Sequence, residues 1–169
     1  MHYEAWQFLR QFGDDKRHHI LDIGGRDLNT SQQGYDLRNL WPNSRITILD
    51  KEPGPNVDIV ADATSWISPM LFSIVICTEV FEHEYRWPLI IERARRAMLW
   101  EGKFLITCAG PGRAEHSGIV DGPLQVGEYY RNVQPIELKE HLARSQFSSV
   151  VTYHTPHGQR DVQAIARPV

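Results

Sequence analysis

The stretch that most constrains the fold is HHILDIGGRDLNTS, residues 18–31. Its apolar run, residues 20–23, is typical of a buried strand in a parallel sheet. Gly24 and Gly25 follow and allow a sharp turn that another molecule can approach closely. The polar residues 29–31 can then cap a helix. A strand, a tight glycine turn and a helix start form the first unit of a nucleotide-type crevice.

Two acidic residues indicate which ligand suits this turn. Asp22 lies at the mouth of the expected strand, and Asp27 lies inside the turn. A dinucleotide fold would place pyrophosphate against the backbone amides here, and two carboxylates would repel it. They favour a ligand that carries ammonium and sulfonium charges and no phosphate. The leading cofactor hypothesis is therefore S-adenosylmethionine.

Acidic side chains also follow the later apolar runs. Asp50 can accept hydrogen bonds from both ribose hydroxyls, a feature that NAD-binding folds share. Asp62 can meet an adenine amino group or simply cap a turn. Glu79 can contact the methionine end of the cofactor. His83 can orient a substrate, accept its proton or brace its own loop.

Hydrophobic patterns predict the remaining elements. Further strands are expected at residues 45–50, 57–60, 72–77, 103–108, 149–154 and 162–166. Helices are expected before Gly13, over residues 30–40, from Pro88 through Met98, and over residues 135–147.

A long loop, residues 109–134, contains five glycines and little periodicity. Loops of this length are commonly lids or binding segments, so substrate recognition is expected here. Some of its side chains must simply anchor the loop. The candidate substrate contacts are Arg113, His116, Asp121, Tyr129, Tyr130 and Asn132.

Composition narrows the functional classes. The 169 residues, 41% of them hydrophobic, suit one domain over residues 1–169. A net charge of −3 argues against a broad footprint for nucleic acid or anionic membrane. Without a secretory signal or a membrane-spanning run, a cytoplasmic protein is expected. His154 and His157 lack companions at structural zinc spacing, so no metal site is expected.

With these residues in place, the chain resembles the class I S-adenosylmethionine-dependent methyltransferases, particularly the small type-11-like members. The resemblance covers most of the chain and is carried, in family order, by ILDIGG, ILDKEPG, VADAT, FSIVICTEVFEH and LWEGKFLI. It implies a Rossmann-like, doubly wound α/β fold with helices on both faces of the sheet. That sheet would have seven mostly parallel strands, the last of them antiparallel.

The same motifs imply where the cofactor binds. The expected contacts are Asp22, Gly24, Gly25, Asp50, Lys51, Asp62, Ala63, Thr78 and Glu79. The chain departs from the family at one place. The family often shows D-x-G-x-G-x-G, whereas this chain has Arg26 and Leu28 where the later glycines would fall. Backbone approach to the methionine moiety and the tightness of binding are the properties that this departure puts in question.

The expected reaction is in-line transfer of the sulfonium methyl group to an oxygen, nitrogen or carbon of a small-molecule acceptor. His116 and His83 are candidate bases, and Tyr129 or Tyr130 can orient the acceptor. Three alternatives remain open. The altered turn favours a non-catalytic S-adenosylmethionine-binding or interaction module. An NAD-dependent oxidoreductase lacks its G-x-G-x-x-G turn, and a nucleic-acid methyltransferase is disfavoured by the mild acidity.

Overall fold

The computed structural model describes residues 3–26, 35–120, 122–154 and 160–169. The helices are α1 (Tyr3–Leu9), α2 (Trp87–Arg96) and α3 (Pro135–Arg144), and two 3-10 turns are η1 (Leu37–Asn39) and η2 (Phe81–His83). The strands are β1 (His19–Ile23), β2 (Arg45–Asp50), β3 (Ile59–Val60), β4 (Phe72–Thr78), β5 (Met98–Ala109), β6 (Phe147–His154) and β7 (Asp161–Pro168).

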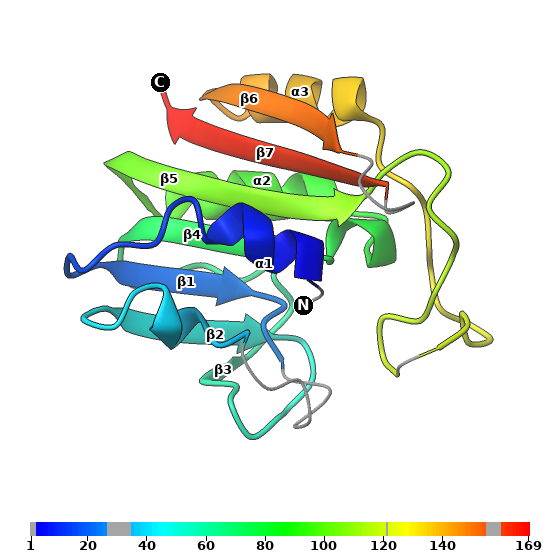
Figure 1. The fold of residues 1–169 in the computed structure, drawn as a ribbon, viewed down its shortest axis with the longest axis horizontal. Coiled ribbons are helices and arrows are strands. Elements are labelled where there is room, and N and C mark those ends of the chain that lie inside the picture. The colour runs from blue at the N-terminus through cyan, green and yellow to red at the C-terminus, as the bar shows by residue number, and fades with distance from the viewer. Residues whose placement is uncertain (1–2, 27–34, 121, 155–159) are drawn as a thin grey trace.

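The seven strands form one sheet in the order β3-β2-β1-β4-β5-β7-β6. The first five strands of the chain pair in parallel with one another. Strand β7 runs antiparallel between β5 and β6 (Figure 1). The expected α/β fold, with a mostly parallel seven-stranded sheet and an antiparallel last strand, is therefore confirmed.

The direction of strand addition reverses at β1. The chain adds β2 and β3 on one side of β1 and then returns to place β4 on the other side. In doubly wound sheets, ligands bind beyond the carboxyl ends of the strands at such a reversal. The carboxyl ends of β1 and β4 therefore mark the expected site.

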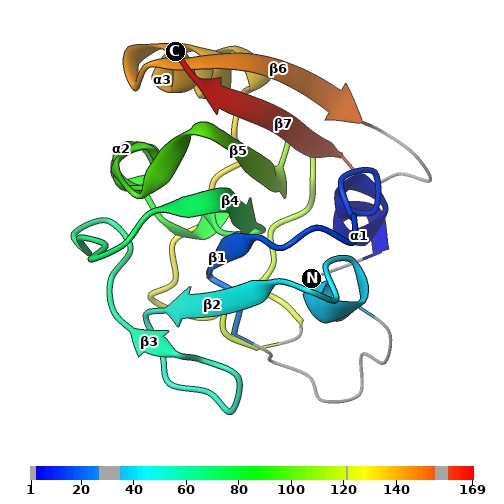
Figure 2. The same cartoon turned by 90° about the vertical axis from the view of Figure 1, so that its left-hand side faces the viewer.

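Alternating side chains along the strands divide the core into two layers. On one face, Leu21, Val75 and Phe104 join a buried cluster that includes residues of α2 and α3. On the other, Ile20 and Ile76 pack with residues of α1. Figures 1 and 2 show α1 on one side of the sheet and α2 and α3 on the other, so helices cover both faces as expected.

Three expected helices differ from the observed structure. The helix expected over residues 135–147 ends at Arg144, and Phe147 begins β6 instead. Met98 begins β5, paired with Phe72, because the apolar position that would extend α2 serves equally well in a strand. Of the helix expected at residues 30–40, residues 30–34 lie outside the described ranges. The remainder contains only η1, since Pro42 disfavours a helical conformation at the residue before it. No helix in the described ranges has the length and apolar character needed to cross a membrane.

Candidate active site at the carboxyl edge of the sheet

The glycine turn after β1 closes tightly around Asp22. Gly24 adopts a positive φ of 75°, and its amide donates to the Leu49 carbonyl at 2.7 Å. A Cβ atom on Gly25 would lie only 2.2 Å from Oδ2 of Asp22, so the carboxylate lies directly against the turn. Burial raises the pKa of Asp22 to about 7, and the negative charge of Asp50 adds to the shift.

Asp50, at the end of β2, is already engaged by the residue that departs from the family motif. The Arg26 amide donates to Oδ2 of Asp50 at 3.2 Å, and Nε of Arg26 lies 3.9 Å from Oδ1. The Glu52 amide donates to the same Oδ1 at 3.0 Å. The Arg26 side chain therefore lies beside the carboxylate that was expected to bind ribose.

Asp62, after β3, is likewise bound within the chain. Its Oδ1 accepts from the amide and hydroxyl of Thr64 at 2.8 and 2.6 Å, and its Oδ2 accepts from Arg86 at 2.9 Å. Burial acts to raise the pKa of Asp62, but these hydrogen bonds outweigh it and hold the pKa below its usual value. The side chain caps a turn, and an adenine contact stays a prediction.

The other expected cofactor residues lie along the same edge. Lys51 follows β2 and is exposed, Ala63 packs partly buried against the core, and Thr78 ends β4. Asp27 lies outside the described residues. The ends of neighbouring parallel strands thus bring most of the expected cofactor residues to the carboxyl edge of the sheet.

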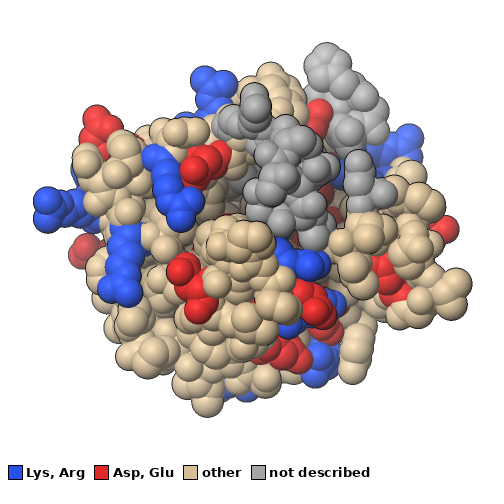
Figure 3. Space-filling model, turned by 90° about the horizontal axis from the view of Figure 1, so that it is seen from below, with Lys and Arg blue, Asp and Glu red and all other residues tan. Residues whose placement is uncertain are grey.

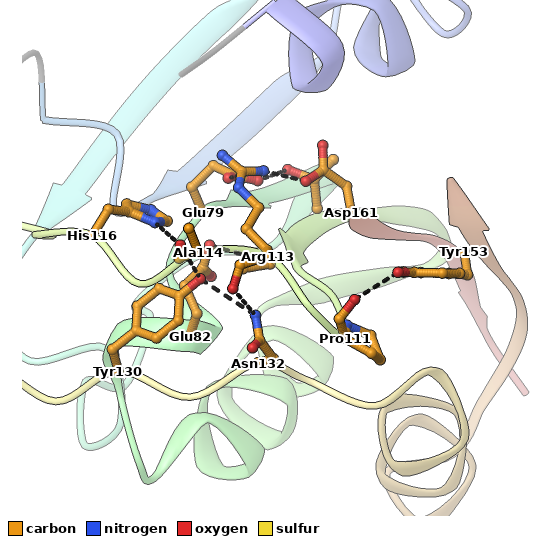
Figure 4. A network of polar contacts seen from close by, with 12 residues as sticks. Glu79, Glu82, Pro111, Arg113, Ala114, His116, Tyr130, Asn132, Tyr153 and Asp161 are labelled. Atoms are coloured by element: carbon orange, nitrogen blue, oxygen red, sulfur yellow. Dashed lines mark hydrogen bonds and ion pairs between the residues drawn. The ribbon is translucent and has the colours of Figure 1, made fainter. Parts of the chain in front are cut away.

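An ion-paired network links the end of β4 to β7. The Arg113 guanidinium forms an ion pair with the fully buried Asp161 and also lies 3.4 Å from Oε2 of Glu79 (Figure 4). The Thr107 hydroxyl donates to Oε1 of Glu79 at 2.8 Å, and Glu79 itself adopts a positive φ of 58°. Sequence analysis named Glu79 and Arg113 but missed Asp161, because no motif surrounds it.

Of the titratable residues of η2, one is fully buried and another is partly buried. Glu82 is fully buried, and its Oε1 accepts from the Ala109 amide at 3.0 Å. Burial raises the pKa of Glu82 well above its usual value, and the charge of Glu79 adds to this. Burial also lowers the pKa of His83 to about 4, so its ring is neutral at pH 7.

Three rings from η2 and the long loop pack together. His83, His116 and Tyr130 have centroid separations of 5.0 to 5.4 Å. The Tyr130 hydroxyl donates to the Ala114 carbonyl at 3.1 Å, and burial raises its pKa above the usual value. The structure therefore brings together the two histidines that sequence analysis named as candidate bases.

Some predicted substrate residues line an open hollow beside this ring cluster. The hollow has a volume of about 510 Å³, which is suited to a small molecule. Tyr129 lies apart from its lining and contacts the Tyr85 ring instead, at 6.1 Å. Asp121 lies outside the described residues. The hollow is lined by Arg113, Glu115, Tyr130, Arg131, Asn132 and Gln134.

The long loop is fastened by a residue that sequence analysis did not identify. Glu128 accepts hydrogen bonds from the Ser117 hydroxyl, the Gly118 amide and the Gln125 amide at 2.9, 3.2 and 2.6 Å. The Asn132 side chain donates to the Arg113 carbonyl at 3.1 Å. A Glu three residues after a Gln carries no signal for such a role.

Solved structures share this fold over nearly the whole chain. DhpI in complex with SAH aligns with a TM-score of 0.67 and 20% identity, over 97% of this chain and 82% of its own. The 1,6-didemethyltoxoflavin-N1-methyltransferase of Burkholderia thailandensis, with 1,6-didemethyltoxoflavin and S-adenosylhomocysteine bound, aligns with a TM-score of 0.70 and 14% identity over 98% and 77%. The glycopeptide N-methyltransferase MtfA, complexed with S-adenosyl-L-methionine, aligns with a TM-score of 0.67 and 15% identity over 98% and 93%.

This chain shares the Rossmann-like fold of these methyltransferases. No protein-family model matches the sequence, and no curated protein matches it at a significant level. The similarity is therefore one of architecture. Within this Rossmann-like fold, the acids of β1 and β2 and the ring cluster after β4 occupy the same carboxyl edge of the sheet.

Proposed function

We propose that the chain is an S-adenosylmethionine-dependent methyltransferase with a small-molecule acceptor. The observation that carries this proposal is the position of Asp22 and Asp50 beside the glycine turn, in a fold shared with methyltransferases that bind S-adenosylmethionine or S-adenosylhomocysteine. Carboxylates at this edge suit an ammonium group and ribose hydroxyls, whereas they would repel the pyrophosphate of a dinucleotide.

Each part of the cofactor has a proposed position along the strand ends. Asp22 faces the methionine ammonium group, and Asp50 accepts the ribose hydroxyls. Asp62 with Ala63 lies toward adenine, and Glu79 lies toward the methionine end. The remaining proposed cofactor contacts are Gly24, Gly25, Lys51 and Thr78.

The hollow beside Tyr130 is the proposed acceptor site. Its lining supplies cationic and amide donors from Arg113 and Asn132, and Tyr129 is retained as an orienting residue near it. The neutral His83 and its neighbour His116 are proposed as proton acceptors when the acceptor must lose a proton. The protein's main contribution would be alignment of nucleophile, methyl and sulfur, because the sulfonium is already activated.

A non-catalytic cofactor-binding module is a second candidate, and the Arg26–Asp50 contact favours it. An arginine beside the ribose-binding carboxylate competes with the ribose hydroxyls for its oxygens. Such a module would show weak cofactor binding, or none, and no methyl transfer.

Nucleic-acid methylation has less support. Arg86 is held by Glu84 and Asp62, and Arg93 donates to a backbone carbonyl at 3.2 Å. On the face seen in Figure 3, the described basic and acidic side chains are intermixed rather than gathered into one basic area. Phosphate binding requires basic groups that are free to replace counterions.

Thermal unfolding with and without ligand tests the proposed function. S-adenosylhomocysteine at one hundred times its dissociation constant should add roughly 2.7 kcal/mol of stability, whereas NAD should add none. Asp50→Ala should lose the shift because the ribose hydroxyls lose their acceptor. Asp36→Ala, an exposed acid beside η1, is the matched control and should keep it.

Turnover is measured next as release of S-adenosylhomocysteine from S-adenosylmethionine in a screen of small hydroxyl, amine and carbon acids. Absence of a thermal shift at millimolar S-adenosylhomocysteine would overturn the proposal. A shift that persists in Asp50→Ala would place the ligand elsewhere and would also contradict it.

A further inference from the structure

Three side chains with metal-binding atoms converge at the carboxyl end of β4. Glu82 and His83 come from η2, and His116 comes from the long loop after β5. One ligand atom from each residue lies within 4.8 Å of the other two. Within the described ranges, this is the one group of three or more His, Cys, Asp or Glu residues with that arrangement.

The carboxylate of this group has an unused oxygen. Glu82 is fully buried, and Oε1 is occupied by the Ala109 amide. Its Oε2 is also buried and has no hydrogen-bond partner among the described residues. A carboxylate removed from water is costly unless a donor or a cation compensates it. A cation bound to Oε2 would supply that compensation.

The two imidazoles are also suited to ligation. Nδ1 of His83 is buried and has no hydrogen-bond partner in the described part of the chain. Nδ1 of His116 lies 3.2 Å from the Ala114 carbonyl, which leaves the opposite ring nitrogen for an ion (Figure 4). A backbone carbonyl on the far nitrogen fixes the tautomer and orientation of metal-bound histidines in general.

We infer that Glu82, His83 and His116 form a binding site for one divalent transition-metal ion. Two imidazoles and one carboxylate suit ions such as Zn²⁺, Mn²⁺, Co²⁺ or Fe²⁺ and leave coordination positions open for another ligand. Ligand atoms about 2.0–2.2 Å from one ion lie at most about 4.4 Å apart. The three ligand atoms lie within 4.8 Å of one another, which is close to that limit.

The ion has a role that rests on the proposed function. An open coordination position would take a hydroxyl oxygen of the acceptor and lower the pKa of that hydroxyl. The hydroxyl proton leaves to solvent, the oxygen electron pair forms a bond to the methyl carbon, and the carbon–sulfur pair stays on sulfur. The products are the methyl ether or ester and S-adenosylhomocysteine. The two histidines are then ligands rather than proton acceptors.

Metal binding by the purified full chain tests this inference without any need for turnover. After treatment with a chelator and its removal, the protein is dialysed against Mn²⁺ or Zn²⁺, and the bound metal is measured by plasma mass spectrometry. One ion per chain is expected. Glu82→Gln and His116→Ala should each weaken binding by at least about tenfold, since each removes a ligand.

His19→Ala is the matched control, because His19 is an exposed histidine at the amino end of β1. It should bind the ion as the unmodified chain does. His116→Gln, in a loop position, provides a second variant if Glu82→Gln does not fold. The inference is overturned if the unmodified chain binds no ion, or if the His116 variants bind it as tightly as the unmodified chain.

Thermal unfolding with S-adenosylhomocysteine on the same samples separates the two proposals. Metal binding without a cofactor shift would support the metal site and overturn the proposed function. A cofactor shift without metal binding would do the reverse, leaving His83 and His116 as the packed ring pair seen beside Tyr130.

Discussion

The acid that ends β2 and the acid that follows β3 differ from the buried groups after β4 in the hydrogen bonds and ion pairs that they already make. Asp50 and Asp62 are engaged by Arg26 and Arg86 of the same chain. Glu82, in contrast, retains a buried oxygen that no described residue satisfies. A cofactor at the proposed Asp50 and Asp62 contacts would therefore displace contacts within the protein, whereas a ligand in the second region would complete contacts. Affinity at the proposed contacts would consequently be lowered by competition within the protein.

The largest expected effect concerns Arg113, whose ion pairs link the end of β4 to β7 and are expected to stabilise the fold. Arg113→Ala removes the cation beside Asp161, whose side chain is fully buried, and beside Glu79. Breaking a buried pair from one side typically costs 3–5 kcal/mol because the remaining buried charge loses an oppositely charged partner. We expect a loss of about that size in the free energy of unfolding, measured by chemical denaturation.

Arg144→Ala is the control for that measurement, because Arg144 pairs with Glu140 at an exposed position of α3. It should cost less than about 1 kcal/mol. Equal losses in the two variants would show that the Arg113 network stabilises no more than a surface ion pair.

The next effect depends on pH and concerns the glycine-turn region. The pKa of Asp22 is raised to about 7 in the folded chain from 3.8, so the native state retains a proton that the unfolded chain releases. Its stability contribution is therefore full below about pH 4 and is lost as pH rises toward 7. Asp22→Asn should flatten this decline, which is on the order of 2–4 kcal/mol, in denaturation curves across that pH range. An unchanged slope would contradict the raised pKa.

A smaller effect is expected at Gly24, where the turn is tight. Gly24→Ala forces a side chain onto a positive φ of 75° and places its Cβ 2.2 Å from Cγ2 of Val80. The expected loss of stability is about 1–3 kcal/mol. Gly127→Ala is the matched control, since Gly127 has a positive φ of 92° but open space around it. If the two variants lose equal stability, the contact with Val80 contributes nothing.

The smallest effect tests competition at Asp50 directly. Arg26→Gly restores the glycine of the family motif and frees the carboxylate from the guanidinium. Partly exposed ion pairs contribute up to about 1 kcal/mol, so S-adenosylhomocysteine should bind about two- to fivefold more tightly. Isothermal titration calorimetry measures this change, with Arg38→Gly, a surface arginine in η1, as the control. Weaker binding in Arg26→Gly would instead make the arginine a cofactor contact.

The sheet was predictable because its strands carry short, continuous apolar runs that end in turn residues. Sequence analysis places Met98 in a helix, whereas it begins β5, because a single apolar residue is compatible with both the helical period of 3.6 and the strand period of two. Helix boundaries are weakly marked in sequence for that reason.

The acids of the candidate site were predictable where a residue lies in the last two positions of a strand or directly follows it. Asp22, Asp50 and Glu79 met that condition. Asp161 did not, because its partner Arg113 is 48 positions earlier in the chain and no local pattern joins them. The contact of Arg26 with Asp50 and the approach of His116 to His83 depend on loop paths that composition does not encode. The expectation of no metal site rested on local spacing alone, and the metal inference opposes it.

The position of β7 sets an order for assembly. Asp161 begins the strand that inserts between β5 and β6, so the partner of Arg113 arrives only when this late segment pairs. Contacts of such long sequence separation slow folding, because loop-closure entropy is lost before the pairing compensates it. During synthesis, β1, β2 and β4 emerge before β7. A nascent chain interrupted before Asp161 would therefore hold the carboxyl ends of these strands without the buried partner of Arg113.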